Sequence, residues 1–290
     1  MPELPEVEHV KRGVAPVVEG QRILSVTFSP AVIAGKADGK ETIIKGGSLD
    51  DFIQHSVGYV FTRVERRSKY IVFHLENEHT TRVILSHLGM AGGYFVVPTL
   101  DDITVPNYRK HWHVIFELDN GMKLVYSDIR RFGELRNIEN YDAYPSFLAI
   151  APEPFETEAK AYYMHQINMK RHLNKPIKQL ILDHRIIAGC GNIYACEALY
   201  LAGIHPSRTP NELTPEAQAR VFDKVRHVLE LGIAKGGTSI SDYRHADGNT
   251  GEMQNHLNVY KQRQCLGCGH EIETKVIATR NSHFCPICQK

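Results

Sequence analysis

The first residues of the chain could carry out covalent chemistry. The chain begins Met1-Pro2-Glu3-Leu4-Pro5-Glu6, and trimming of Met1, which a small second residue generally allows, would leave Pro2 with a free secondary amine. An α-amino group titrates at about 7.7–8.0, so a useful fraction is uncharged near neutral pH. Such an amine can attack an electrophilic carbon and form an iminium. Glu3 lies one residue away and could donate or accept a proton.

The same residues also fit an ordinary helix start, and taken alone they favour it. Pro5 suits a first helical position, and Glu6 and Glu8 suit the positive end of a helix. Further along, the spacing of the valines predicts a buried stripe; these are Val7, Val10 and Val14. The reactive amine is therefore one of two interpretations of this segment.

Four of the six cysteines lie at the end of the chain with metal-ligand spacing. Cys265-x2-Cys268 is followed by sixteen residues and then by Cys285-x2-Cys288. Each two-residue gap lets a pair of thiolates reach one tetrahedral ion, and the longer gap suits a β-hairpin. We therefore predict one structural zinc, because four thiolates leave no open position for catalytic water. Disulfides are the alternative, and they are disfavoured because the N-terminus carries acids where a signal peptide needs a basic and then apolar stretch.

Two glycine-containing segments could contact a nucleic acid. Ser127-Asp128-Ile129-Arg130-Arg131-Phe132-Gly133 follows a predicted hairpin strand, and an exposed Arg-Arg-Phe would suit phosphate binding with insertion into a base stack. The alternative is a salt-bridged turn with Phe132 buried. Gly189-Cys190-Gly191-Asn192 precedes a predicted helix and could hold a phosphate, although such glycines often only make a turn. We expect Cys190 and Cys196 to be core residues.

Composition places the chain among ordinary globular proteins. It has 290 residues, of which 42% are hydrophobic and 23% charged, and a formal net charge of +1. This length allows two domains, each with its own core. Since no apolar run approaches the roughly 20 residues of a membrane span, we expect a cytoplasmic protein. Any surface for nucleic acid must be a local basic patch, because the net charge does not indicate one.

The pattern of elements changes near residue 150. Before it, short β-rich runs occupy 59–64, 70–75, 81–88, 94–97 and 113–118, and Asp119-Asn120-Gly121 predicts a hairpin turn into 122–126. We therefore predict a β-sandwich or barrel with the opening helix against it. After 151–154, helical periodicity predicts helices from Asn192 to Ala202 and from Pro215, capped by Thr214, to Gly236. Two helices joined by turn-rich residues form an expanded helix-turn-helix.

These motifs occur together, and in the same order, in one family. They are the Pro-Glu-Leu-Pro-Glu start, Arg66-Arg67-Ser68-Lys69-Tyr70, His87-Leu88-Gly89-Met90, the Asp128 to Gly133 segment, Gly191-Asn192-Ile193-Tyr194-Ala195 and the four-cysteine finger. The chain thus resembles the bacterial formamidopyrimidine-DNA glycosylases, also called 8-oxoguanine DNA glycosylases, from residue 2 to residue 288. Leu4 favours this branch over the related endonuclease VIII branch, which typically has glycine there.

The resemblance implies an α+β protein in three parts. These are an N-terminal catalytic β-sandwich with an N-terminal helix at 2–150, a helical helix-two-turns-helix domain at 151–258 and a β-hairpin zinc finger at 259–290. It further implies a bifunctional glycosylase and abasic-site lyase of base excision repair, which acts as a monomer on duplex DNA with oxidised purines. The nucleoid would be its place of action. The alternatives are an enzyme for oxidised pyrimidines and a catalytically silent protein that binds damaged DNA.

The resemblance also implies roles for individual residues. Pro2 resembles the nucleophile, Glu3 the proton donor and Glu6 a nearby helper, while Lys69 and Arg280 match residues that contact phosphate and assist β- and δ-elimination. Asn192 corresponds to a clamp on the same backbone. Met90, Arg130 and Phe132 resemble the trio that fills the hole left by an everted base, although Met90 would ordinarily be a core filler. Further DNA contacts are expected from Arg131 and His111, and a lesion-covering loop from 238–251. Ile129 and Cys190 depart from common family residues without removing a functional group.

Overall fold

The computed structural model describes residues 2–239 and 251–290 and consists of two compact units. The first unit comprises Met1–Leu148 and Gly236–Gly251, and the second comprises Ala149–Lys235 and Glu252–Lys290. Within the described residues, no helix combines the length and the apolar character that crossing a membrane requires.

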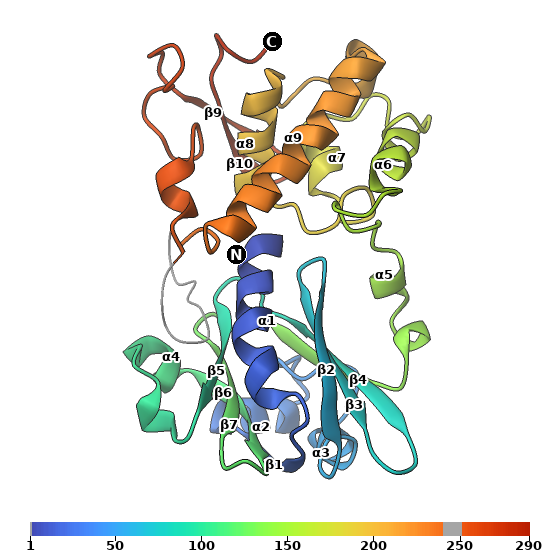
Figure 1. The fold of residues 1–290 in the computed structure, drawn as a ribbon, viewed down its shortest axis with the longest axis vertical. Coiled ribbons are helices and arrows are strands. Elements are labelled where there is room, and N and C mark those ends of the chain that lie inside the picture. Colours follow the sequence, from blue (N-terminus) through green and yellow to red (C-terminus); the bar gives the residue numbers. More distant parts are fainter. Residues whose placement is uncertain (1, 240–250) are drawn as a thin grey trace. The chain divides into compact units, whose positions relative to one another are not determined.

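The first unit is the β-sandwich that the sequence predicts (Figure 1). One antiparallel sheet has the strand order β1 (Ile23–Phe28), β6 (Trp112–Leu118), β7 (Lys123–Asp128), β5 (Gly92–Val97), and the other β2 (Val60–Arg67), β3 (Tyr70–Glu76), β4 (Thr81–His87), β8 (Glu134–Ile138). The expected hairpin joins β6 to β7, and Gly121 adopts the positive φ of +81° that this turn needs. Short helices lie in the connections: α2 (Pro30–Ala37), α3 (Leu49–Gln54), α4 (Pro106–Lys110) and α5 (Pro145–Leu148).

The opening helix α1 (Leu4–Val18) contacts β2 and β3 of one sheet and β5 of the other. Its predicted valine stripe is buried and extends to Val18. These valines join one core with aromatic side chains of both sheets, such as Phe73 and Phe116. The helix interpretation of the first residues is therefore confirmed, and packing of this apolar face fixes where the N-terminus of α1 lies in the unit.

The second unit is helical, with a small hairpin. Its elements are α6 (Ala159–Ile167), α7 (Ile177–Leu182), α8 (Asn192–Ala202), α9 (Pro215–Ala234), β9 (Glu273–Ile277) and β10 (Arg280–Phe284). The helix α8 has its predicted bounds, whereas α9 begins at the predicted Pro215 and ends at Ala234, before the predicted Gly236. The backbone N–H of Ala217 donates to Thr214 Oγ1 at 3.3 Å. The α8–α9 pair is the expected helix-two-turns-helix. Cys190 and Cys196 are buried, as predicted.

Candidate active site

The carboxylates behind Pro2 are buried at the start of α1. Pro2 directly precedes the N-cap residue Glu3, and the exposed fractions of Glu3 and Glu6 are 3% and 2%. The backbone N–H of Glu3 donates to Glu6 Oε2 at 2.8 Å. This is the reciprocal contact of a capping box, which satisfies a backbone donor that the helix leaves without a partner. Glu6 thereby fixes the backbone that carries Pro2 and Glu3.

The second oxygen of Glu6 holds a distant segment of the same unit. Glu6 Oε1 accepts a hydrogen bond from the backbone N–H of Thr238 at 2.6 Å. Gly237 has a φ of +78°, and a Cβ there would lie 2.9 Å from Glu6 Oε1, so only glycine fits. Because backbone donors occupy both of its oxygens, Glu6 is a positioning residue. Residues 240–250 of the predicted lesion loop lie outside the described residues.

An ion-pair network links α1 to the turn that carries Lys69. Glu8 accepts from Arg12 Nε at 2.8 Å and from Arg66 Nε at 3.0 Å, and lies 3.2 Å from Lys11 Nζ. Burial favours the neutral carboxyl, but these cations outweigh it and lower the pKa of Glu8. Arg66 also donates to the carbonyl of Ser68 at 3.1 Å. One guanidinium therefore joins the opening helix to the residue before Lys69.

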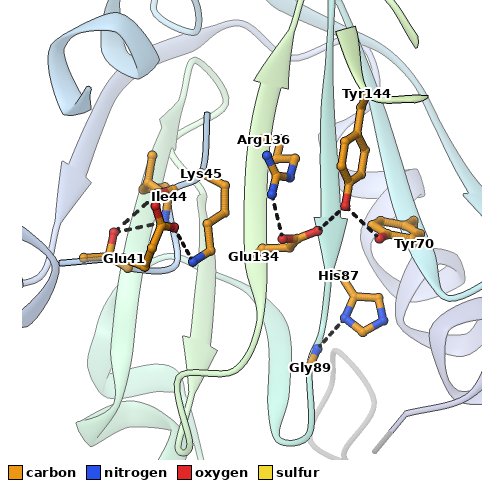
Figure 2. Close-up of polar contacts among 10 residues, drawn as sticks. Glu41, Ile44, Lys45, Tyr70, His87, Gly89, Glu134, Arg136 and Tyr144 are labelled. Atoms are coloured by element: carbon orange, nitrogen blue, oxygen red, sulfur yellow. Dashed lines mark hydrogen bonds and ion pairs between the residues drawn. The ribbon is translucent and has the colours of Figure 1, made fainter. Parts of the chain in front are cut away.

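Lys69 lies in the tight turn between β2 and β3. The pair formed by Arg67, at the end of β2, and Tyr70, at the start of β3, closes this turn. Ser68, within the turn, has a φ of +56°. Figure 2 shows the chain of contacts that fixes Tyr70: its hydroxyl lies 3.5 Å from that of Tyr144, which donates to Glu134 Oε1 at 3.3 Å. Burial, and then the contact with Tyr144, raise the pKa of Tyr70. The turn is therefore anchored by polar groups of β8 and of the segment after it.

Tyr70 also connects this turn to the Met90 loop. Its ring centroid lies 5.0 Å from that of His87, whose Nδ1 accepts from the backbone N–H of Gly89 at 3.1 Å (Figure 2). Gly89 has a φ of +60°, and a Cβ there would come within 2.4 Å of the Phe132 carbonyl carbon. The loops that carry Met90 and Phe132 are therefore in direct contact. Met90 is half-buried, so it is not the core filler that its residue type suggests.

The Arg-Arg-Phe loop is organised by the buried carboxylate of Asp128. Its two oxygens accept the backbone N–H groups of Arg130, at 3.0 Å, and Gly133, at 2.8 Å. Phe132 is 60% exposed, with the Arg130 guanidinium 5.3 Å from its ring centroid. The alternative of a salt-bridged turn with a buried Phe132 is therefore wrong. The ring is exposed, and in the described part of the chain neither Arg130 nor Arg131 forms an ion pair. An exposed aromatic and two cations are thus held on a rigid turn.

His111 and Arg131 line a common hollow of about 430 Å³ beside this loop. Under the hollow lies the buried His113, whose ring nitrogens are 3.0 Å from Ser29 Oγ and 3.0 Å from the Asp128 carbonyl oxygen. Burial lowers the pKa of His113, although the contact with Asp128 opposes this shift. A neutral imidazole therefore lies beneath His111 and the cationic Arg131, and this hollow suits an anionic ligand.

In the second unit, Asn192 joins α8 to the hairpin. Its Oδ1 accepts from Lys178 Nζ at 2.7 Å, and its Nδ2 donates to the Asn281 carbonyl at 2.9 Å. Lys178 is fully buried and also donates to Ser282 Oγ at 2.6 Å. Because an amide nitrogen carries two hydrogens, Asn192 retains one donor beyond Asn281.

Arg280 is exposed at the start of β10, directly after a turn in the left-handed region. The φ values of Ala278 and Thr279 are +49° and +62°, as in a type I′ hairpin turn. Such values are unfavourable for a β-branched residue. Ser68, Arg131 and Thr279 are three of the five non-glycine residues with positive φ in the described ranges, and each adjoins a predicted DNA contact. Strain of this kind concentrates at functional sites.

The four finger cysteines form a compact cluster. Their sulfur atoms all lie within 4.8 Å of one another, with 3.8 Å between Cys265 and Cys288 and 3.5 Å between Cys268 and Cys285. Tetrahedral zinc with Zn–S bonds of about 2.3 Å requires sulfur separations of about 3.8 Å. The donor set therefore fits one structural zinc ion with no open position.

Sequence reasoning missed the residues that hold these groups. Tyr144, Lys178 and the buried Glu197 are the clearest cases. A usable signal exists for two of them. Lys178 and Glu197 lie in largely apolar helical segments, where a charged side chain needs dedicated partners. Tyr144 has no such signal, because its partner Tyr70 is 74 residues away.

Comparisons with known proteins agree with this geometry. Family models match the formamidopyrimidine-DNA glycosylase N-terminal domain at residues 1–135, its H2TH domain at 150–244 and the zinc finger found in FPG and IleRS at 265–290. Formamidopyrimidine-DNA glycosylases of Streptococcus thermophilus and Exiguobacterium sp. are 37% and 38% identical, each over 100% of both chains. The Lactococcus lactis Fpg in complex with abasic-site DNA has a TM-score of 0.82 at 33% identity, over 99% of both chains. The MutM (FPG) protein of Thermus thermophilus has the same TM-score and identity, over 99% of this chain and 98% of that one. The chain belongs to the formamidopyrimidine-DNA glycosylase family.

Proposed function

We propose that this DNA glycosylase removes oxidised purines from duplex DNA through an imine at Pro2 and then cleaves the abasic strand. The amine of Pro2 attacks C1′ of the damaged nucleotide, and the electrons of the glycosidic bond leave with the base. Glu3 supplies the proton for the departing base or for the opening sugar. The C1′–O4′ bond then breaks, O4′ takes up a proton, and the resulting imine acidifies the C2′ proton. Its removal breaks the C3′–O bond, and a second elimination breaks the C5′–O bond.

One observation carries this proposal: two buried carboxyl groups lie directly behind Pro2, and one of them braces the backbone of the other. A helix start that served only to begin α1 would not need Glu3 and Glu6 out of water, since burying carboxylates is costly. Glu6 is engaged by two backbone donors and positions the segment, so we assign proton transfer to Glu3, the carboxyl group next to Pro2 in the chain.

Several of the DNA contacts that we propose lie at the three turns with positive φ. Lys69, Arg280 and the remaining amide hydrogen of Asn192 would bind backbone phosphates, and His111 and Arg131 would bind further phosphates at their hollow. Met90, Arg130 and Phe132 would fill the space left by the everted nucleotide, with the exposed Phe132 ring inserted into the stack. Zinc, when bound, holds the hairpin that presents Arg280.

We also propose the division of labour along the chain. Residues 2–150 would supply the chemistry, while 151–258 and the finger at 259–290 would grip the duplex. The protein would act as a monomer in the bacterial cytoplasm, at the nucleoid, because its substrate lies there. Binding should weaken steeply as salt rises, since several phosphate contacts release counterions.

Borohydride trapping tests the imine. Full-length protein with Met1 removed, as verified by mass spectrometry, is mixed with duplex DNA that carries 8-oxoguanine opposite cytosine, and borohydride reduces any imine to a stable amine. We expect a covalent adduct whose cross-linked peptide begins at Pro2. Protein that retains Met1 is the matched control and should form none.

Two results would contradict the proposal. Absence of an adduct with processed protein would exclude imine chemistry, and an adduct that maps to another residue would show that Pro2 is not the nucleophile. Parallel duplexes with an oxidised pyrimidine test the lesion class, because a faster reaction there would assign the chain to the pyrimidine-preferring branch.

A further inference from the structure

A tyrosine of α8 reaches the zinc cluster from outside the finger. The hydroxyl of Tyr200 lies 3.3 Å from Cys265 Sγ. Among the described residues, Cys265 is its only hydrogen-bond partner, and no other side chain outside the four cysteines hydrogen-bonds one of their sulfurs. The ring itself packs against the cluster of Cys196, Val259 and Cys265. The contact therefore joins the metal site to α8, a helix that lies outside the finger in the chain.

The first knuckle leaves room for this hydroxyl. A Cβ on Gly267 would lie 2.8 Å from the Tyr200 oxygen, closer than real Cβ atoms approach. The φ of Gly267 is not in the positive region, so backbone conformation does not require glycine at this position. Close approach of the phenol is the remaining physical reason for glycine there.

Chemistry fixes the direction of the hydrogen bond once zinc is bound. A metal-bound cysteine is a thiolate and carries no proton, whereas a phenol can donate. Tyr200 must then be the donor. Such an outer partner withdraws charge from the sulfur of a site with a net charge of −2 and orients the ligand.

We propose that Tyr200 is an outer-sphere partner of the zinc site, and that its hydrogen bond to the Cys265 thiolate ties metal retention to α8. The same helix carries Asn192 at its start and Glu197 in its middle. The Glu197 carboxylate accepts the backbone N–H groups of Asn258, Val259 and Tyr260 at 2.7, 3.0 and 2.8 Å. One helix thus holds the beginning of the finger, its first knuckle and, through Asn192, its hairpin.

The test is zinc release from full-length, zinc-loaded protein to a chromogenic chelator. Tyr200→Phe keeps the packed ring and removes only the hydroxyl. We expect zinc affinity to fall, and release to accelerate, by about 10- to 100-fold. Tyr162→Phe is the matched control, because its hydroxyl donates to the Arg185 carbonyl at 3.0 Å, and its zinc release should equal that of the parent protein.

A second readout separates a hydrogen bond from packing. In cobalt-substituted protein, loss of a hydrogen bond to a thiolate should move the sulfur-to-cobalt charge-transfer band to lower energy. We expect this movement in Tyr200→Phe and in Gly267→Ala, which displaces the hydroxyl while leaving Tyr200 intact. Unchanged zinc release, or faster release with an unmoved band in both variants, would overturn the proposal. Zinc release and the cobalt spectrum depend neither on DNA nor on the imine. Their outcomes are therefore independent of the proposed function.

Discussion

The N-terminal site of the first unit, at Pro2, Glu3 and Glu6, and the zinc finger of the second unit differ in the sequence separation of the contacts that hold them. At the N-terminus, Glu6 reaches Glu3 across three positions of one helical turn. In the finger assembly, Lys178 reaches Ser282 across 104 positions, and Asn192 reaches Asn281 across 89. The groups that we propose to make and break bonds are thus held by a local capping box and by one distant contact, from Glu6 to Thr238, whereas the finger is held by contacts that form only in the completed fold.

This difference also explains how the carboxyl groups of the N-terminal site become buried. A local capping box can be formed as soon as α1 forms, and packing of the valine stripe then buries both carboxylates. The finger, in contrast, has few apolar contacts of its own, and its position depends on a metal and on polar contacts from α8. Variants in the two regions should therefore fail in different ways.

The largest effect should come from Glu3→Gln, which keeps the shape of the side chain and removes its acidity. We expect the rate of 8-oxoguanine release to fall by about 10²- to 10⁴-fold, the range typical of a lost general acid. Single-turnover excision measures this rate. The free energy of unfolding should change little, because Gln keeps a side-chain oxygen that can accept the backbone N–H of Glu6 in the capping box.

A duplex that already contains an abasic site sharpens this prediction. If Glu3 acts on the departing base, the variant should still form the borohydride-trapped adduct with abasic DNA, where no base has to leave. Equal losses on both substrates would instead place the role of Glu3 at the sugar.

Glu197→Ala should have the next largest effect, and it should appear as lost stability. Glu197 is 1% exposed and accepts three consecutive backbone N–H groups and the Asn258 side chain. Removing it leaves buried donors without partners, so we expect the free energy of unfolding to fall by about 3 kcal/mol or more. Denaturant unfolding of zinc-loaded protein gives this value.

The control is Glu230→Ala on α9. Glu230 forms an ion pair with Arg226 on the exposed surface of the same helix, and such pairs contribute about 0.3–0.5 kcal/mol. Similar losses in the two variants would show that the carboxylate of Glu197 does not anchor the finger.

What the sequence could predict follows the same division. Local signals specified α1, α8, α9, the β6–β7 hairpin and the zinc cluster, because caps, turns and cysteine spacing act over a few residues. Strand β1 was missed because a bulge between Ile23 and Ser25 breaks its alternation. Strand β8 was missed because Leu135 is the one buried residue among its five.

The contacts between candidate site residues were beyond sequence reasoning. The motif around Asp128 indicated an arginine loop, but not that the Asp128 carboxylate would organise its backbone. The backbone of Phe132 likewise packs against the Gly89 turn, which only the fold brings there. Long-range contacts of this kind have no periodicity that a linear pattern could reveal.

A gain in stability is expected at the hairpin turn before Arg280. Replacing Ala278 and Thr279 by Asn and Gly introduces residues that accept positive φ, so the free energy of unfolding should rise by about 1–2 kcal/mol. Thr274→Gly on the extended strand of the same hairpin is the control and should lower it. If the turn variant is less stable than the parent, the left-handed backbone there is not strained.

The smallest effect should be a pH dependence of the first unit through His113. Because burial lowers its pKa, folded His113 stays neutral while the unfolded state takes up a proton below about pH 6.5. The stability that neutral His113 contributes is therefore fully present above that pH. It is lost as pH falls toward the folded pKa, by no more than about 1.4 kcal/mol per pH unit.

The free energy of unfolding is measured at pH 7.5 and at pH 5.5. Both values lie above the usual range of carboxyl titration, so histidines dominate the difference. His113→Asn should reduce the acid loss, whereas His79→Asn, at an exposed position, should leave it unchanged. An equal acid loss in all three proteins would assign the pH dependence to other histidines, such as His283, whose pKa is also lowered by burial.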